Sequence, residues 1–176
     1  MKLSKEIDKE SIEKYTAGER DFSGVDLKGV DLKGVNLAGI CLRGATLDNV
    51  NLTNANLRGV NLSGACIGGV VFDNANISNA RMSGIDIGGI YLRGVNFTKA
   101  ELCGAYLDGV IIEDVIFDEA LMRGIRFAQC TVRRTSFIAT NLRGCDIDEV
   151  QFFDVDFSDA FLKGFCMFET SGVGLK

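Results

Sequence analysis

Large apolar residues recur at every fifth position of this chain, from Phe22 to Met167, without interruption. A smaller residue, most often Val, Ile or Ala, stands two positions before most of them. On an α-helix, positions five apart are rotated by about 140°, so this apolar set would be spread over all faces. On a flat strand, the odd spacing would send successive large residues to opposite sides. The pattern therefore predicts a backbone that turns a corner once in each quintet.

A second interval indicates how many corners close a circuit. One corner column is glycine every twenty residues, whereas the three other columns mix glycine with asparagine and lysine. A period of twenty inside a period of five predicts four repeats per coil, and thus a quadrilateral parallel β-helix of about 7.5 coils stacked ladder on ladder. The structural corner glycines are Gly24, Gly44, Gly64, Gly84, Gly104, Gly124, Gly144 and Gly164.

Within a quintet, the large and small residues should point inward, the residue between them outward, and the last two should form the corner. Glycine, asparagine and aspartate suit this corner because they accept unusual backbone angles or bond their own turn. We expect one all-β domain with three parts: an N-terminal capping helix and lead-in over residues 1–20, the β-helix over 21–170, and a C-terminal tail over 171–176.

The quintets resemble the pentapeptide-repeat family, whose pattern is A(D/N)LXX. The segment NLTNANLRGVNLSGA (51–65) matches this pattern closely, and the lead-in YTAGERDFSG (15–24) is similar to the start of many cyanobacterial members. The resemblance implies a right-handed coil, which the residues alone do not give. It also implies functions, since some members mimic duplex DNA and bind type II topoisomerases such as gyrase, and others regulate differentiation or stress. The topoisomerase binders typically have a C-terminal helical module and widespread negative charge, and this chain departs from both features.

The formal net charge of −5 conceals a difference between faces. The first face of the predicted square carries an excess of arginine and lysine, and the second carries an excess of carboxylates. The acidic face could attract a basic partner surface, or it could only keep the protein in solution. The candidate acidic face consists of Asp26, Asp48, Asp86, Asp108, Asp146, Asp148 and Glu149.

Outward positions become more apolar beyond residue 100. Ile111 is spaced by twenty from Tyr91 and by forty from Val71, which predicts an apolar strip on the third face. Ile116 and Leu121 would carry this strip around the next two corners. Single exposed apolar residues are ordinary, whereas a contiguous strip is typical of a protein contact, and both interpretations remain open.

The last coil is rich in aromatic residues. Phe153, Phe161 and Phe168 should point outward as candidate contact residues, and Phe165 stands where alanine is usual. Two arrangements would protect the open end of the ladder. The tail could fold over it as a cap, or two chains could meet there as an end-to-end homodimer.

Candidate chemistry is sparse. The chain has no histidine, no phosphate loop and no zinc-binding pattern, so we assign no catalytic, cofactor-binding or metal-binding residue. Cys130 and Cys145 take inward positions, either as core thiols or close to each other, and the other four cysteines are too far apart or face outward, which favours a reducing, cytoplasmic location. No segment approaches the ~20 apolar residues of a membrane span.

These observations predict a non-enzymatic protein-interaction or scaffold module with an unidentified protein partner, no cofactor and no membrane contact. The acidic balance and the lack of outward aromatics interleaved with basic residues argue against nucleic acid. The alternative function is that of a DNA mimic that binds gyrase.

Overall fold

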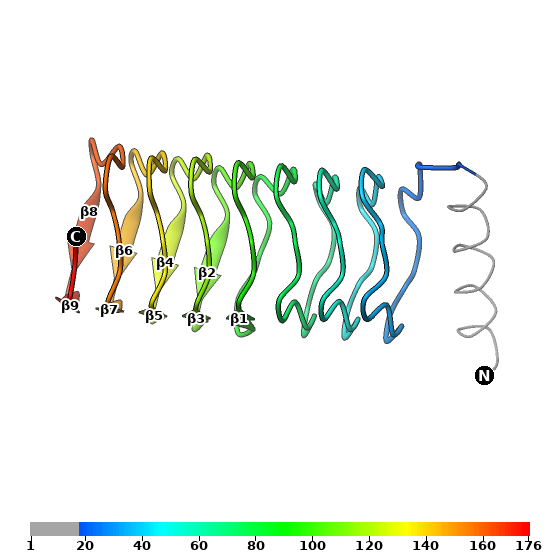
Figure 1. Ribbon diagram of the computed structural model, residues 1–176, viewed down its shortest axis with the longest axis horizontal. Helices are drawn as coiled ribbons and strands as arrows, with labels where there is room; N and C mark the ends of the chain where they lie inside the picture. The colour runs from blue at the N-terminus through cyan, green and yellow to red at the C-terminus, as the bar shows by residue number, and fades with distance from the viewer. Residues whose placement is uncertain (1–17) are drawn as a thin grey trace.

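The computed structural model describes residues 18–176, which form a single stack of coils (Figure 1). Every backbone pairing in this range is parallel and joins residues twenty apart, from Asp21 with Cys41 to Phe153 with Val173. The pairs fall into four columns, one on each side of the coil. The first, second, third and fourth sides begin at Asp21, Asp26, Asp31 and Asn36, respectively. The parallel β-solenoid with four repeats per coil is therefore confirmed.

Continuous strands occur on two sides of the second half of the stack. The third side carries a five-stranded sheet in the order β1-β3-β5-β7-β9, and the second side carries a four-stranded sheet in the order β2-β4-β6-β8 (Figure 1). Elsewhere the described ladder consists of single bridges. The strands are β1 (Tyr91–Arg93), β2 (Tyr106–Asp108), β3 (Ile111–Glu113), β4 (Arg126–Ala128), β5 (Thr131–Arg133), β6 (Asp146–Asp148), β7 (Gln151–Phe153), β8 (Cys166–Phe168) and β9 (Ser171–Val173).

The interior is one apolar column, as the quintet pattern predicts. The large residue of each quintet is buried along almost the whole stack, and the small residue beside it is buried in most coils. On the fourth side, Phe97, Phe117, Phe137 and Phe157 stack with ring centroids 5.0 to 5.1 Å apart. Each coil thus buries its apolar surface against the coils above and below it.

Corners are made by one residue with positive φ. All eight glycines of the first corner column have φ between 61° and 74°. The same backbone conformation is taken by asparagine, aspartate and glutamate at many other corners, and by Ala139 at φ 55°. Asparagine and aspartate side chains also accept bonds from the corner backbone, as Asp26 does from the N–H of Lys28 at 3.0 Å.

The two ends of the solenoid can be compared with the expected N-terminal helix and C-terminal tail. The N-terminal capping helix expected before Gly18 lies outside the described residues. Residues 18–176 contain no helix, so none in this range could cross a membrane. At the other end, β9 lies within the segment expected to be a tail and pairs with β7. Phe157 N–H also donates to the carbonyl of Lys176 at 2.8 Å. The last residues therefore prolong the ladder and do not fold over its end.

Candidate functional site

The ladder is interrupted between two neighbouring coils. On the first and fourth sides the columns of bridges run past this point unbroken. On the second side, Cys66 forms no bridge with Asp86, and on the third side Val71 forms none with Tyr91. Residues at the same positions pair with each other elsewhere in the described chain. The interruption thus opens two adjacent sides of the solenoid around one shared corner.

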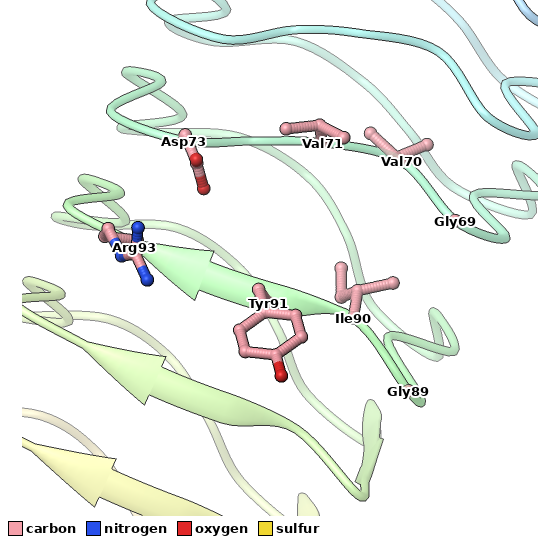
Figure 2. A pocket seen from close by; sticks show the side chains of 8 residues that line it. All are labelled: Gly69, Val70, Val71, Asp73, Gly89, Ile90, Tyr91 and Arg93. Carbon is pink, nitrogen blue, oxygen red and sulfur yellow. The ribbon is translucent and has the colours of Figure 1, made fainter.

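A cavity of about 490 Å³ lies at the interruption on the third side. Figure 2 shows that one coil forms its upper rim and the next coil, with strand β1, forms its lower rim. Tyr91 is 60% exposed and Val71 is 43% exposed, so both side chains are accessible from solvent. The upper rim consists of Gly69, Val70, Val71 and Asp73, and the lower rim of Gly89, Ile90, Tyr91 and Arg93.

A second cavity of about 590 Å³ lies around the corner, on the second side. It is lined by the carboxylates of Asp86 and Asp108 together with backbone of Gly68, Gly88 and their neighbours. Ala65, which also lines it, is only partly buried, whereas the equivalent Ala45 one coil earlier is fully buried. The interruption therefore reaches the edge of the core.

The predicted apolar strip is assembled in two pieces. Tyr91 and Ile111 are direct partners on strands β1 and β3, as their spacing predicts. Val71 lies across the first cavity from Tyr91 and does not pair with it. Ile116 and Leu121 are 40% and 43% exposed on the two following sides. The expectation of an unbroken stack over Val71 is thus wrong at this one step, because the two coils do not pair there.

The acidic residues do not form a continuous acidic surface. Arg126 on β4 stands in register between Tyr106 and Asp146. Some candidates accept local hydrogen bonds, such as Asp48, which accepts a bond from the N–H of Gly68 at 3.1 Å. Asp86 and Asp108 line the second-side cavity. The candidates that line neither of these two cavities are Asp26, Asp48, Asp146, Asp148 and Glu149.

The outward aromatic residues near the C-terminus are spread over different sides. Arg133 lies 4.4 Å from the ring centre of Phe153, and Arg143 lies 5.4 Å from that of Phe161. Phe168 is 69% exposed. A separate cavity of about 180 Å³ at the open end is lined entirely by apolar side chains, those of Phe152, Phe157, Leu162, Phe165, Met167 and Leu175.

The quintet pattern does not reveal a charged cluster beside the strip. Arg134 donates from Nε to Asp114 at 2.7 Å and from Nη2 to Glu113 at 2.7 Å. These bonds hold the pKa of Asp114 below its usual value and raise that of Arg134. Arg93 also reaches Glu113, at 3.6 Å. The cluster ties neighbouring coils together at a corner of the third side.

The six cysteines are unpaired. Cys130 and Cys145 are buried, and their thiols donate to the carbonyls of Leu107 and Met122 at 3.2 and 2.9 Å. Burial raises the pKa of each thiol to about 11, so both are neutral core groups at ordinary pH. Residues 18–176 contain no group of three or more metal-ligating side chains.

The sequence does carry one signal for the interruption. Gly68–Gly69 and Gly88–Gly89 are the corners at which both positions are glycine, and they lie one coil apart at the shared corner. The quintet pattern treats them as ordinary corners, because the second glycine of each has the usual positive φ. The first glycine of each pair, Gly68 or Gly88, is the unusual one, because this position carries a side chain at the other corners.

Comparison with known proteins agrees with this architecture. The family model described as pentapeptide repeats matches in eight copies, over residues 20–49, 36–74, 55–94, 86–124 and 120–159. No curated protein matches the chain.

Among solved structures, alr5209, a pentapeptide repeat protein from Nostoc PCC 7120, is 34% identical with a TM-score of 0.51, covering 54% of this chain and 76% of its own. HetL, a pentapeptide repeat protein involved in heterocyst differentiation regulation from the cyanobacterium Nostoc sp. strain PCC 7120, is 18% identical over 93% of both chains, with a TM-score of 0.28. QnrB1, a plasmid-mediated fluoroquinolone resistance protein, is 12% identical over 87% of this chain and 91% of its own, with a TM-score of 0.44. The repeats matched by the family model cover most of the sequence, and the chain belongs to the pentapeptide-repeat family.

Proposed function

We propose that this protein is a non-catalytic protein-interaction module whose contact surface is the apolar strip of the third side. The observation that carries the proposal is the pairing of Tyr91 with Ile111 beside a cavity that also exposes Val71. Contiguous exposed apolar side chains rimmed by charged residues are typical of protein contact sites. Ile116 and Leu121 extend the surface around two corners, so a partner would contact three sides of the solenoid.

A site-specific photo-crosslink tests this surface. A benzoylphenylalanine residue in place of Tyr91 should capture a protein from native lysate, whereas the same residue in place of Phe168 should not. Phe168 is the matched control because it is an aromatic residue, 69% exposed on the second side, that lines neither cavity. Replacing Ile111, Ile116 and Leu121 by serine should abolish the capture at position 91. Equal capture at positions 91 and 168, or capture that survives the triple replacement, would exclude the strip.

A second candidate role is end-to-end homodimerisation at the C-terminal coil. It is supported by the wholly apolar end cavity and by Met167 and Leu162, which are 51% and 42% exposed although they stand in core columns. We expect sedimentation to show a dimer that Met167→Asp with Leu162→Asp converts to monomer. Phe168→Asp, an outward position of the same coil, is the control and should stay dimeric. A wild-type monomer at about 100 μM would exclude this contact.

The gyrase-binding alternative has a direct test. A DNA mimic needs a long negative surface, and Arg126 interrupts the acidic side in this chain. We therefore expect micromolar protein to leave gyrase supercoiling unchanged, and inhibition or protection of the enzyme would reinstate this function.

The proposal also includes a right-handed coil of about 7.5 turns and a cytoplasmic location. The six unpaired cysteines support a reducing compartment. Anomalous or high-resolution diffraction would fix the hand and the number of turns, and fractionation of the source cells would test the location.

A further inference from the structure

The two coils at the interruption face each other with strand edges whose bonding groups are unused. In the coil before it, the N–H of Leu47 donates to the carbonyl of Cys66 at 2.7 Å. The equivalent N–H groups of Ile67, Gly69 and Phe72 make no backbone hydrogen bond in the described chain. Ile67 and Phe72 are buried, and buried backbone donors are nearly always paired, so their missing bonds on this edge require an explanation.

The facing edge, on the coil that carries Asp86 and Tyr91, also has unpaired backbone N–H groups. The N–H groups of Asp86 and Tyr91, which would reach back to the preceding coil, also lack a backbone acceptor among residues 18–176. On its other side this coil pairs with the next one, since the N–H groups of Ile87 and Gly89 donate to the carbonyls of Tyr106 and Asp108, each at 2.8 Å. Each rim is therefore a well-formed strand edge on its outer side and an open one toward the cavities. An open edge with alternating donors and acceptors is what an added strand recognises.

The glycine pairs explain why this junction opens. At other corners, side chains bridge neighbouring coils, as Gln129 Nε2 does by donating to Glu149 Oε2 at 3.1 Å. The corners at residues 68–69 and 88–89 carry no side chain that could reach across. Glycine also leaves the backbone accessible and widens its conformational choice. The mouth of the opening is thus bare backbone on both rims.

The charges that line the two cavities indicate which kind of peptide segment could bind there. The two cavities are lined by the carboxylates of Asp73, Asp86 and Asp108 and by the single guanidinium of Arg93, which is 3.6 Å from Glu113 outside the cavities. A basic segment is therefore favoured over an acidic one. The third-side cavity adds the apolar surfaces of Val71 and Tyr91. With about 490 and 590 Å³, each cavity has the size of a ligand site.

We propose that the opening between the coils at residues 64–72 and 83–91, here called the coil slot, binds an extended basic peptide segment of a partner protein by β-strand addition. Backbone groups of the peptide pair with the open edges, its basic side chains lie near Asp86 and Asp108, and its aliphatic side chains lie against Tyr91. This inference rests on the proposed function, because it names the class of partner that the module takes.

A labelled peptide of alternating lysine and valine, Lys-Val-Lys-Val-Lys-Val, tests the coil slot by fluorescence anisotropy. We expect saturable binding that protects the amides of Ile67, Gly69 and Phe72 from hydrogen exchange. The same peptide with alternate amides N-methylated should bind at least about tenfold more weakly, because each backbone bond is worth about a factor of two to ten. Equal binding of the methylated peptide, or no binding at about 1 mM, would overturn the proposal.

A pair of charge variants locates the site. Asp86→Asn with Asp108→Asn should weaken peptide binding about three- to tenfold, since exposed charge pairs contribute little each. Asp146→Asn with Asp148→Asn, on the same side but on β6 away from the cavities, should leave it unchanged. Equal losses in the two double variants would place the contact elsewhere and refute the slot.

The outcomes separate this inference from the proposed function. If the peptide fails to bind while crosslinking at Tyr91 still depends on Ile111, Ile116 and Leu121, the coil slot is wrong and the interaction surface stands. If the peptide binds and the crosslink at position 91 survives the triple replacement of Ile111, Ile116 and Leu121, the surface is wrong and the slot stands.

Discussion

The two halves of the solenoid share one core pattern but differ in how firmly their coils are joined. Before the coil slot, the ladder consists of single bridges, and corners are mostly glycine or asparagine. After it, continuous strands form on two sides, four phenylalanines stack inside the fourth side, and Arg134 joins two coils through Asp114. The comparison shows that the inward quintet residues set the coil, whereas corner residues and cross-coil side chains set how closely neighbouring coils pair.

Truncating one large core residue in each half should give the largest effect. Phe117 stacks on a ring to each side at 5.0 Å, whereas Phe72 borders the coil slot. We expect both Phe→Ala changes to cost about 3 to 5 kcal/mol of unfolding free energy, with Phe117→Ala costing more because ring pairs add about 0.5 to 1.5 kcal/mol each. Urea unfolding measures both, and an equal or larger loss for Phe72→Ala would contradict the comparison.

Substitutions at two corners of the second half should change the unfolding free energy by an intermediate amount and in opposite directions. Gly144 has φ 67° with open space where a β-carbon would stand, and Ala139 already holds φ 55°. A left-handed conformation costs a non-glycine residue about 1 to 2 kcal/mol, partly offset by the entropy of the unfolded chain. We expect Gly144→Ala to lower the unfolding free energy by about 1 kcal/mol and Ala139→Gly to raise it by about 0.5 kcal/mol. Urea unfolding of the two variants checks this, and the same sign for both would show that φ does not govern these corners.

The thiols of the two halves should differ in reactivity and pH dependence. A thiol reagent at pH 8 should modify Cys66, which is exposed, and spare Cys130 and Cys145. Burial raises the pKa of these two from 9.0 to about 11, so the unfolded chain loses their protons first as the pH rises. Their stabilising contribution is complete below pH 9.0 and is lost between 9.0 and about 11. Replacing both by alanine should remove this part of the pH dependence, and an unchanged profile would exclude the assignment.

The exposed ion pair should have the smallest effect. Arg134 lowers the pKa of Asp114, so its contribution is present above the usual value of 3.8 and is lost as the pH falls through the lower folded-state value. Arg134→Gln should flatten the acid side of the stability profile slightly, and added salt should mask the change. Lys99→Gln, which removes the pair of Lys99 with Glu119 at 3.3 Å, is a control for any single ion pair. A profile that steepens in Arg134→Gln would contradict the sign.

The periodic part of this molecule could be predicted from sequence, and its exceptions could not. The unbroken quintets determine which side chains point inward, because a fault in one would expose a large apolar residue. They also place Tyr91 beside Ile111, since strict spacing of twenty determines register. The interruption at Val71 escaped prediction because backbone pairing between coils depends on the corner side chains, and Gly68 and Gly88 fit the quintet equally well. The Arg134 cluster also escaped, because long side chains choose partners across a corner that the period does not specify.

Amide hydrogen exchange across the interruption tests the central claim most directly. Ile67, Gly69 and Phe72 occupy the same positions as Leu47, Asn49 and Leu52 one coil earlier, whose N–H groups donate to the next coil at 2.7 to 2.8 Å. If the coil slot is open, the first three amides should exchange roughly a hundredfold faster than the second three in the free protein, since local opening sets protection. Equal protection of the two sets would show that the ladder is continuous there and that the slot does not exist in solution.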